Sequence, residues 1–367
     1  MKIIKIEVFK LNLPFTLSWK IPLGVIDKAA NVVIKVSTDK GIVGWGEGSP
    51  FPQITGDSQA TNIATAKHLA KLVMGQNPLA IESRMAEINL QYVAEPSIRS
   101  AFDMAFYDIL GKSAQLPLYA LLGGEKRPLR TDFTIGMQET VEQTLSELDN
   151  LLSMGFDAIK MKVGRSGLED VAHVKAVRDQ VGEDVLIKID SNQGWDYQTA
   201  CANLKAMEPL NIHYSEQPIA AWDYENLARL RTRASMPICV DESVFDDRDA
   251  MKIIKKGAAD YLNIKLGKSG GLHTALRINA VAQASGNKCM IGCFAESRLA
   301  LSACAHLACA RPNIEFIDLD SGYLFNQDPV IGGMQYSQGG LITLPDAAGL
   351  GAEFDESFLE LVHSIGG

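Results

Sequence analysis

From about residue 130 onward, short apolar runs alternate with longer amphipathic stretches. The stretches 140–154, 168–181 and 247–256 repeat their apolar residues with a helical period. Eight strands that alternate with helices are typical of an α/β fold with a closed barrel. The apolar runs predict these eight strands at residues 132–137, 158–163, 185–190, 212–217, 237–241, 261–266, 289–293 and 314–319.

The first 125 residues have a different order, with strands before helices. The opening run MKIIKIEVFKLNL alternates apolar and polar residues, which predicts a half-exposed strand. Two more strands are expected near 30–37 and 42–48. Helical patterns follow near 59–75, 79–92 and 97–115. Strands followed by helices indicate a small α+β domain.

The chain therefore divides into an α+β domain over 1–125, a barrel over 126–324 and a last segment over 325–367. A length of 367 residues suits two domains or one barrel with additions. The last segment is rich in glycine and lacks a helical period. We expect it to leave the barrel and pack against the first domain.

Charged residues close successive apolar runs of the barrel region. Lys160 and Lys162 close one run, and the next four end in Asp190, Glu216, Asp241 and Lys265. The intervals from Lys162 to Lys265 are 28, 26, 25 and 24 residues, each the length of one strand–helix unit. Barrel enzymes place their chemistry at the C-terminal ends of the strands, so these side chains are expected to face one pocket.

Counting the strands adds a geometric expectation. Lys162 lies on the second predicted strand and Lys265 on the sixth, and strands four apart in a ring of eight lie opposite each other. The three carboxylates lie on the arc between them. A substrate held on that arc would have one lysine on each face.

Three carboxylates from neighbouring strands, with no His or Cys among them, suit a hard divalent cation such as Mg²⁺. The ion would stabilise negative charge that develops on a bound carboxylate. Taken singly, each residue could instead be a salt-bridge partner. The even spacing of Asp190, Glu216 and Asp241 at strand ends favours a shared metal site.

A lysine acts as a base only when its pKa falls toward neutrality. Lys160 and Lys162 share one face of their strand, and their mutual repulsion and the metal are expected to lower the pKa of Lys162. Two alternatives are an ion-paired, solvated edge for this pair and a Schiff base at Lys265, as in an aldolase. The first alternative is disfavoured because Lys160 and Lys162 lie within an apolar run. The second is disfavoured because a Schiff-base mechanism does not need three metal-binding carboxylates.

Asp318 and Asp320 close the eighth run, IEFIDLDSG, and also face the same way. They could form an Asx-type turn at the strand end. The functional interpretation is an anionic clasp for a cation, most naturally a substrate ammonium group. The pocket would then bind a carboxylate at the metal and an amine about a barrel radius away.

Composition narrows the classes of partner. A formal net charge of −9 and a pI near 5.3, without a basic run, argue against nucleic acid. No stretch is long and apolar enough to span a bilayer, and the N-terminus lacks the pattern of a signal peptide. We therefore expect a cytoplasmic protein.

Together these motifs resemble the enolase superfamily, in its muconate-lactonising-enzyme-like subgroup. The resemblance covers essentially the whole chain, including the runs ITGDS (54–58), DSNQGW (190–195) and LNIKL (262–266). It implies a TIM-like (β/α)7β barrel with an N-terminal capping domain that the C-terminal segment completes. Within the subgroup, Asp318-x-Asp320 resembles the dipeptide epimerases, where this motif holds the α-ammonium group of the substrate.

The resemblance also implies a role for each matching position. Lys162 and Lys265 would move the Cα proton of the C-terminal residue through an enediolate, one on each face. Lys160 would contact the substrate carboxylate and lower the pKa of Lys162. The remaining assignments are Mg²⁺, one per subunit, on Asp190, Glu216 and Asp241, and a dipeptide site lined by Thr134, Cys293 and Ala295. Barrels of this family often associate, which leaves a homo-oligomer open.

One departure concerns the specificity loops expected near 15–27 and 50–60. Epimerases that act on Ala-Glu resemble this chain near 15–27 but carry an arginine there for the glutamate side chain. Gly24 stands at that place here, which removes a bidentate partner for a carboxylate. Lys20 could substitute as a point charge, and Trp19 could cover the substrate or simply pack. We therefore expect an Ala-Xaa substrate with a small or apolar Xaa.

Two other activities fit the same scaffold. Muconate cycloisomerase and o-succinylbenzoate synthase share the metal and the lysines, but they have no need for an ammonium clasp. A barrel that binds without catalysis is disfavoured because all five metal and lysine positions are present.

Overall fold

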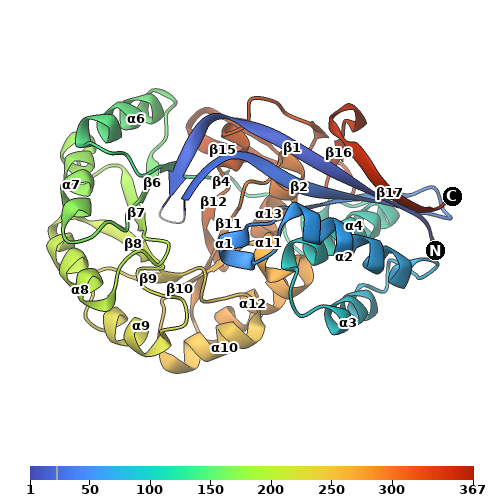
Figure 1. Ribbon diagram of the computed structural model, residues 1–367, viewed down its shortest axis with the longest axis horizontal. Helices are drawn as coiled ribbons and strands as arrows, with labels where there is room; N and C mark the ends of the chain where they lie inside the picture. The colour runs from blue at the N-terminus through green and yellow to red at the C-terminus, as the bar shows by residue number, and fades with distance from the viewer. Residues whose placement is uncertain (22–23) are drawn as a thin grey trace.

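The computed structural model describes residues 1–21 and 24–367, and the side chains of all of these except residues 17–21. It has two parts, a sheet flanked by helices and an α/β barrel beside it (Figure 1). The predicted fold class is confirmed, because eight parallel strands form the barrel sheet and a capping domain adjoins it. Within the described chain, no helix is long and apolar enough to cross a membrane.

The capping sheet has four antiparallel strands in the order β17-β1-β2-β3. Ile6 and Val8 of the alternating N-terminal run are fully buried, while Glu7 between them is partly exposed. The last strand pairs with the first, so the C-terminal segment returns to this domain (Figure 1). The bounds are β1 (Ile3–Ile21), β2 (Gly24–Thr38), β3 (Val43–Gly48) and β17 (Glu360–Gly366).

The prediction of a loop near 15–27 is wrong for most of that range. Strands β1 and β2 continue there as one hairpin, in which Trp19 pairs with Ile26 and Ile21 with Gly24. The run FTLSWKI is rich in aromatic and β-branched residues, which favour strands, and this preference outweighs the signal of the flanking prolines.

Helix α4 lies against strand β3 at a distance that excludes side chains. A Cβ atom added at Gly46 would lie 1.9 Å from the carbonyl oxygen of Ala101, and one at Gly44 would lie 2.2 Å from that of Ala105. Alternate glycines in VGWGEG therefore let the helix approach the strand. The capping helices are α1 (Pro52–Thr55), α2 (Gln59–Val73), α3 (Ile81–Gln91), α4 (Pro96–Ala114) and α5 (Leu118–Leu121).

Each of the eight predicted barrel runs contains one strand of the barrel. The strands are β5 (Phe133–Ile135), β6 (Ala158–Lys162), β7 (Leu186–Asp190), β8 (Ile212–Glu216), β9 (Ile238–Val240), β10 (Tyr261–Ile264), β11 (Lys288–Gly292) and β12 (Ile314–Asp318). The helices between them are α6 (Val141–Ser153), α7 (Glu169–Val181), α8 (Tyr197–Ala206), α9 (Tyr224–Arg231), α10 (Asp247–Lys256), α11 (Leu266–Ser269), α12 (Leu272–Ala284) and α13 (Arg298–Ala310). Short 3-10 turns are η1 (Glu208–Leu210), η2 (Ser321–Tyr323), η3 (Gln338–Gly340) and η4 (Glu356–Phe358).

The barrel sheet runs in chain order from β5 to β12, and its two edge strands meet at a seam. The amide of Asp132 donates to the carbonyl of Ile317 at 3.3 Å, and the amide of Leu319 donates to Thr131 Oγ1 at 2.8 Å. These bonds join the start of β5 to the end of β12. The barrel is therefore nearly closed, and every strand directs its C-terminal end to the same mouth.

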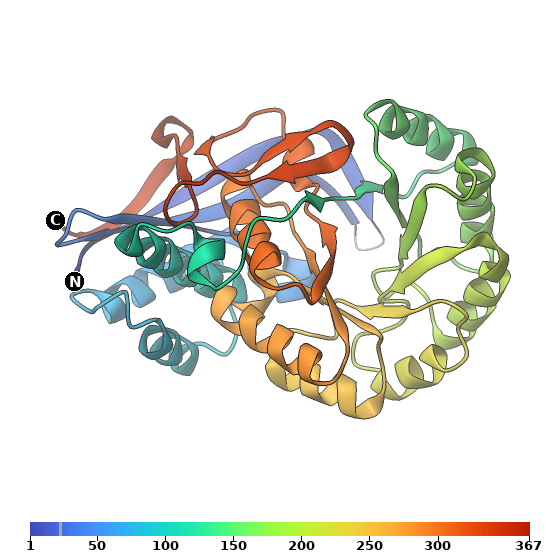
Figure 2. The ribbon, with the colours of Figure 1, turned by 180° about the vertical axis from the view of Figure 1, so that it is seen from behind.

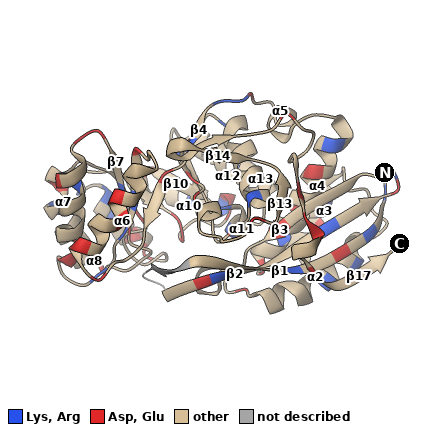
Figure 3. Ribbon diagram, turned by 90° about the horizontal axis from the view of Figure 1, so that it is seen from above, with Lys and Arg blue, Asp and Glu red and all other residues tan. Residues whose placement is uncertain are grey.

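The C-terminal segment contacts both parts of the molecule. Its strand β15 pairs with β4, just before the barrel, and its last strand pairs with β1 (Figure 2). Strand β4 spans Leu129–Arg130. The other strands of the C-terminal segment are β13 (Val330–Gly332), β14 (Gln335–Ser337), β15 (Leu341–Thr343) and β16 (Ala352–Phe354). Charges of both signs are interspersed over the two parts (Figure 3). The domain boundaries at 125 and 324 stay a prediction.

Candidate active site

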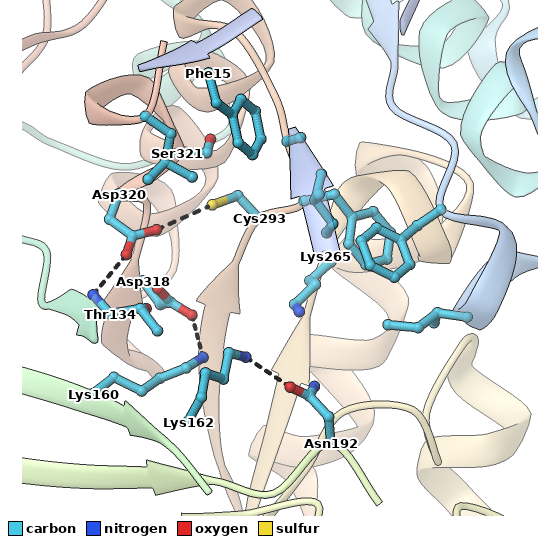
Figure 4. Close-up of a pocket in the computed structure, with 16 residues that line it drawn as sticks. Phe15, Thr134, Lys160, Lys162, Asn192, Lys265, Cys293, Asp318, Asp320 and Ser321 are labelled. Atoms are coloured by element: carbon cyan, nitrogen blue, oxygen red, sulfur yellow. Dashed lines mark hydrogen bonds and ion pairs between the residues drawn. The ribbon is translucent and has the colours of Figure 1, made fainter. Parts of the chain in front are cut away.

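A pocket opens at the C-terminal ends of the barrel strands, under the capping domain (Figure 4). Four capping residues line it together with barrel residues: Phe15, Ile26, Phe51 and Ile54. Its free volume is about 40 Å³. Since one water molecule needs roughly 10–15 Å³ by this measure, this space is enough for a few water molecules.

The structure brings all the predicted site residues together. The three carboxylates Asp190, Glu216 and Asp241 lie fully buried, at ion-pair distance from the lysines of the pocket. The remaining eight line the pocket: Thr134, Lys160, Lys162, Lys265, Cys293, Ala295, Asp318 and Asp320. These residues come from all eight barrel strands or the positions just after them, so the barrel topology alone gathers them.

Lys162 ends strand β6 and is 6% exposed. Its Nζ donates to Asp190 Oδ2 at 2.5 Å. It also donates to Asn192 Oδ1 at 2.9 Å (Figure 4). Asp190 is the last residue of the neighbouring strand β7 and pairs with Lys162, and Asn192 follows two residues later. Strand pairing therefore fixes this ammonium group beside a carboxylate.

Lys160, two residues earlier on the same face, lies deeper in the pocket. Its Nζ donates to Asp318 Oδ2 at 2.6 Å and to Glu216 Oε2 at 3.0 Å, and lies 3.4 Å from Asp190 Oδ2. Burial alone would lower the pKa of Lys160, but these carboxylates outweigh burial and raise it well above its usual value. Lys160 is thus a fixed positive charge that joins three acidic groups.

Lys265 directly follows β10, four strands away from β6 in the order of the sheet. Its Nζ lies 2.8 Å from Asp241 Oδ2 and 5.0 Å from the centre of the Phe294 ring. Burial alone would lower the pKa of Lys265, but Asp241 and Glu216 raise it. In this arrangement Lys265 keeps its proton, and it becomes a base only when those negative charges are offset.

The three carboxylates stand at the ends of adjacent strands β7, β8 and β9. Asp190 is in register with Glu216, and Asp241 directly follows β9. Asn263 Nδ2 donates to Glu216 Oε1 at 2.7 Å, and Lys268 Nζ lies 3.0 Å from Asp241 Oδ1. The set supplies oxygen donors from three directions, as a hard cation requires.

A divalent cation fits the electrostatics of these carboxylates. Burial and then the charges of Asp190 and Asp241 raise the pKa of Glu216, so the negative groups repel one another. Among the described residues, no three His, Cys, Asp or Glu side chains form a ready-made cage. The ammonium groups of Lys160, Lys162 and Lys265 take the carboxylate oxygens instead. The donor chemistry suits Mg²⁺, and binding would require these lysines to release oxygens.

Asp318 and Asp320 form an acidic wall on the far side of Lys160 (Figure 4). Asp320 Oδ2 accepts the amide of Thr134 at 2.9 Å, and Cys293 Sγ lies 3.9 Å from its other oxygen. Burial and then Asp318 raise the pKa of Asp320 to about 6. Burial would also raise the pKa of Asp318, but Lys160 lowers it to about 2. The pair therefore presents an excess of negative charge to the pocket.

Sequence reasoning placed specificity loops near 15–27 and 50–60, but it did not name the apolar residues that line the pocket, and it missed two polar residues. Phe51 stacks on Phe294 with ring centres 5.3 Å apart and planes at 19°. These aromatic residues carry no signal that separates a pocket wall from an ordinary core. Asn192 has a left-handed backbone (φ 39°), which is unusual outside glycine and which the sequence alone does not reveal. The missed residues are Phe15, Ile26, Phe51, Ile54, Asn192, Phe294, Ser321 and Leu324.

Two of the sequence predictions fall outside the described side chains. The proposed contacts of Trp19 and Lys20 with a substrate therefore stay predictions. Gly24, by contrast, is described and exposed, and a Cβ added there would meet nothing within 4 Å. Its φ of 140° nevertheless favours glycine.

Comparison with known protein families matches nearly the whole chain. Residues 3–123 match the N-terminal domain of mandelate racemase and muconate lactonizing enzyme. Residues 143–358 match the enolase C-terminal domain-like family.

Individual relatives are similar over almost their full length. The hydrophobic dipeptide epimerase of Enterococcus faecalis is 38% identical over 352 residues, which cover 96% of this chain and 99% of that protein. The D-Ala-D/L-Ala epimerase of Cytophaga hutchinsonii is 36% identical over 366 residues, which cover 100% of this chain and 99% of that protein.

Solved structures agree with this picture. A dipeptide epimerase from Cytophaga hutchinsonii, in complex with Mg and D-Ala-L-Val, superposes with a TM-score of 0.97 at 36% identity and covers both chains completely. The L-Ala-D/L-Glu epimerase from Bacillus subtilis, in a substrate-liganded complex, gives a TM-score of 0.93 at 35% identity, covering 96% of this chain and 99% of that one.

Proposed function

The chain belongs to the mandelate racemase and muconate lactonizing enzyme family of the enolase superfamily, and from this premise we propose that it is a Mg²⁺-dependent dipeptide epimerase. The observation that carries the proposal is the placement of Lys162 at the end of β6 and Lys265 directly after β10, on two sides of one pocket. Asp318 and Asp320 line that pocket, and the other three carboxylates lie buried beside the lysines. The relatives with this name and the Mg-bound structures support it.

Asp190, Glu216 and Asp241 would hold the ion. Their oxygen donors and their mutual repulsion in a buried site favour a divalent cation. When bound, Mg²⁺ supplies a positive charge that offsets these carboxylates and draws electron density from the substrate carboxylate. With that negative charge offset, the groups that raise the pKa of Lys265 act on it less.

The two lysines would then exchange one proton across the Cα of the C-terminal residue. The neutral Nζ of one lysine takes the Cα proton, and the electron pair of the broken bond moves into the substrate carboxylate group. The protonated Nζ of the other lysine returns a proton to the opposite face. The electron pair returns from the carboxylate group to form the new C–H bond, and the N–H bond of the second lysine breaks. No other bond of the substrate breaks, so the product differs from the substrate only in configuration.

Asp318 and Asp320 would hold the α-ammonium group of the dipeptide. Their side chains line the pocket beside Lys160, and burial and then the charge of Asp318 raise the pKa of Asp320. An ammonium group would offset this charge and lower that pKa. Lys160, already beside Asp318, would at the same time face the substrate carboxylate.

The substrate class that fits best is Ala-Xaa with a small or apolar Xaa. Among the described side chains of the pocket, the positive groups are the three lysines assigned above, and none of the others there could pair with an acidic Xaa side chain. Gly24 offers no side chain there either. The remaining wall is apolar and suits an apolar side chain: Phe15, Ile26, Phe51, Ile54, Phe294 and Leu324.

The test separates this function from a cycloisomerase or an o-succinylbenzoate synthase. Purified protein with Mg²⁺ is given L-Ala-L-Ala and L-Ala-L-Phe, and the L,D products are resolved by chromatography. We expect epimers from free dipeptides and a large loss of activity in Asp318→Asn. Activity on an amine-free substrate of those two enzymes that Asp318→Asn leaves undiminished would contradict the proposal.

A further inference from the structure

The loop that joins β11 to α13, residues 293–297, connects the two halves of the pocket. The ring of Phe294 lies 5.0 Å from Lys265 Nζ and stacks on Phe51 of the capping domain. Cys293 Sγ lies 3.9 Å from Asp320 Oδ1, and Ala295 lines the pocket. A shift of this loop would therefore move the contacts of both a lysine and the acidic wall.

Asn31 of strand β2 holds the backbone of this loop from the capping sheet. It is 1% exposed, and its Nδ2 donates at 2.7 Å to the carbonyl of Ala295 and at 2.7 Å to Glu47 Oε1. Ser49 Oγ donates to the same Ala295 carbonyl at 3.1 Å. Two donors from one domain thus converge on one carbonyl of the other.

Glu47 of strand β3 holds the next turn of the loop. It is 2% exposed, and it accepts the amide of Ser297 at 3.0 Å on Oε1 and the hydroxyl of Ser297 at 2.6 Å on Oε2. Ser297 is the N-cap of α13, so the carboxylate also lies near the positive end of that helix. The partners are 250 residues apart in sequence.

These contacts are more than packing requires. An apolar side chain at either position could fill the space between the sheets without burying a carboxylate or an amide. A network in which every donor and acceptor is paired instead fixes the relative orientation of the two segments, because each hydrogen bond is directional. Here the bonds of both side chains fix the path of the pocket wall relative to the capping sheet.

We propose that Asn31 and Glu47 are positioning residues that set the 293–297 loop, and through Phe294 the orientation of Lys265 toward the substrate. The proposal rests on the proposed function, in which Lys265 is one of two proton-transfer groups. It assigns the capping sheet a part in catalysis besides covering the pocket.

The first test needs no activity. Amide hydrogen exchange of residues 294–297 is followed by mass spectrometry in wild type, Asn31→Ala and Glu47→Ala. We expect exchange at least about tenfold faster in both variants, since Asn31→Ala loses two buried hydrogen bonds and Glu47→Ala loses three. Asn12→Ala is the matched control: Asn12 is exposed on the same sheet, and its side chain accepts a bond from Gln59. Glu47→Gln, which keeps the shape and one acceptor oxygen, should stay near wild type.

The second test measures the role in proton transfer, with the wild-type enzyme and Mg²⁺ in D₂O. In a dipeptide whose Cα–H faces Lys162, Lys162 alone can exchange the Cα proton for deuterium with retention of configuration. Inversion of configuration also needs Lys265. We expect Asn31→Ala to lower the ratio of inversion to retention at least about fivefold, with kcat falling more than KM changes. A merely structural role would lower the amount of active enzyme and leave this ratio unchanged.

Unchanged loop exchange and an unchanged ratio in Asn31→Ala and Glu47→Ala would overturn the proposal. If these variants do not fold, Ser49→Ala decides, because it removes one of the two donors to Ala295 and should give a smaller effect in the same direction. Wild-type protein that epimerises no dipeptide would contradict the proposed function, and loop exchange would then decide the positioning role by itself.

Discussion

Replacement of Lys268 by methionine tests how much the buried ion pair between Lys268 and Asp241 contributes to the free energy of unfolding. Lys268 lies on the short helix α11 and is 1% exposed. Its Nζ lies 3.0 Å from Asp241 Oδ1 and donates at 2.6–2.8 Å to the carbonyls of Asp241, Val244 and Asn263. Methionine keeps the apolar stem and most of the volume, so the change removes the charge and the donors.

The expected cost follows from what the substitution leaves behind. Removing one partner of a buried ion pair costs about 3–5 kcal/mol, because the other charge stays uncompensated. Lys265 still faces Asp241 at 2.8 Å, which places the expected loss near 3 kcal/mol, the lower end of about 3–5 kcal/mol. A domain of ordinary stability, about 5–15 kcal/mol, would remain folded.

The assay is denaturant unfolding at pH 7.5, with and without Mg²⁺. Lys205→Met is the control, because Lys205 is an exposed lysine near the end of α8 and should change the free energy of unfolding by less than about 0.5 kcal/mol. We also expect Mg²⁺ to stabilise Lys268→Met more than wild type, since the ion would return a positive charge to Asp241. A loss below about 1 kcal/mol in Lys268→Met would refute the reasoning from an uncompensated charge.

Three further predictions concern catalysis, the metal and pH. Lys162→Ala and Lys265→Ala should each lower the kcat/KM of epimerisation by at least about 10³-fold, as chromatography of the epimers would show, and normal turnover by either would contradict the two-lysine mechanism. Chelation with EDTA should abolish activity and lower the thermal midpoint, and added Mg²⁺ should restore both; activity that survives exhaustive chelation would exclude the metal role. Burial lowers the pKa of His306 to about 4, and the ring is held neutral between the amide of Tyr119 and the carbonyl of Leu350. Because the unfolded chain binds a proton on this residue near pH 6.5, its contribution should reduce the free energy of unfolding by up to about 3 kcal/mol as pH falls from 6.5 to 4. Denaturant titrations at each pH should show a shallower loss in His306→Gln, and identical slopes would contradict the assignment.

The barrel and its charged ring could be predicted because local patterns encode them. Apolar runs at intervals of 24–28 residues mark the strands, and a charge at the end of a run such as Asp190 or Lys265 lies at the mouth in any closed barrel. Strand spacing also placed Lys162 and Lys265 on opposite strands. None of these inferences needed a contact between distant parts of the chain.

The cover of the pocket could not be predicted in the same way. Phe51 and Phe294 become a wall only because the capping domain docks on the barrel, and apolar residues at such positions look like ordinary core. The bond from Asn31 to Ala295 joins residues 264 apart. The protonation of Lys265 could not be predicted either. Its position at the mouth suggests a base, but the neighbouring Asp241 and Glu216 raise its pKa.

Deuterium uptake at Cα tests the central claim most directly. Wild-type protein and Mg²⁺ are incubated in D₂O with a panel of L,L- and L,D-dipeptides, and the products are separated by configuration and weighed by mass spectrometry. Two-lysine proton transfer predicts a gain of one dalton at the C-terminal residue in a subset of dipeptides, in the inverted product. No gain with any dipeptide in the panel would contradict the epimerase function.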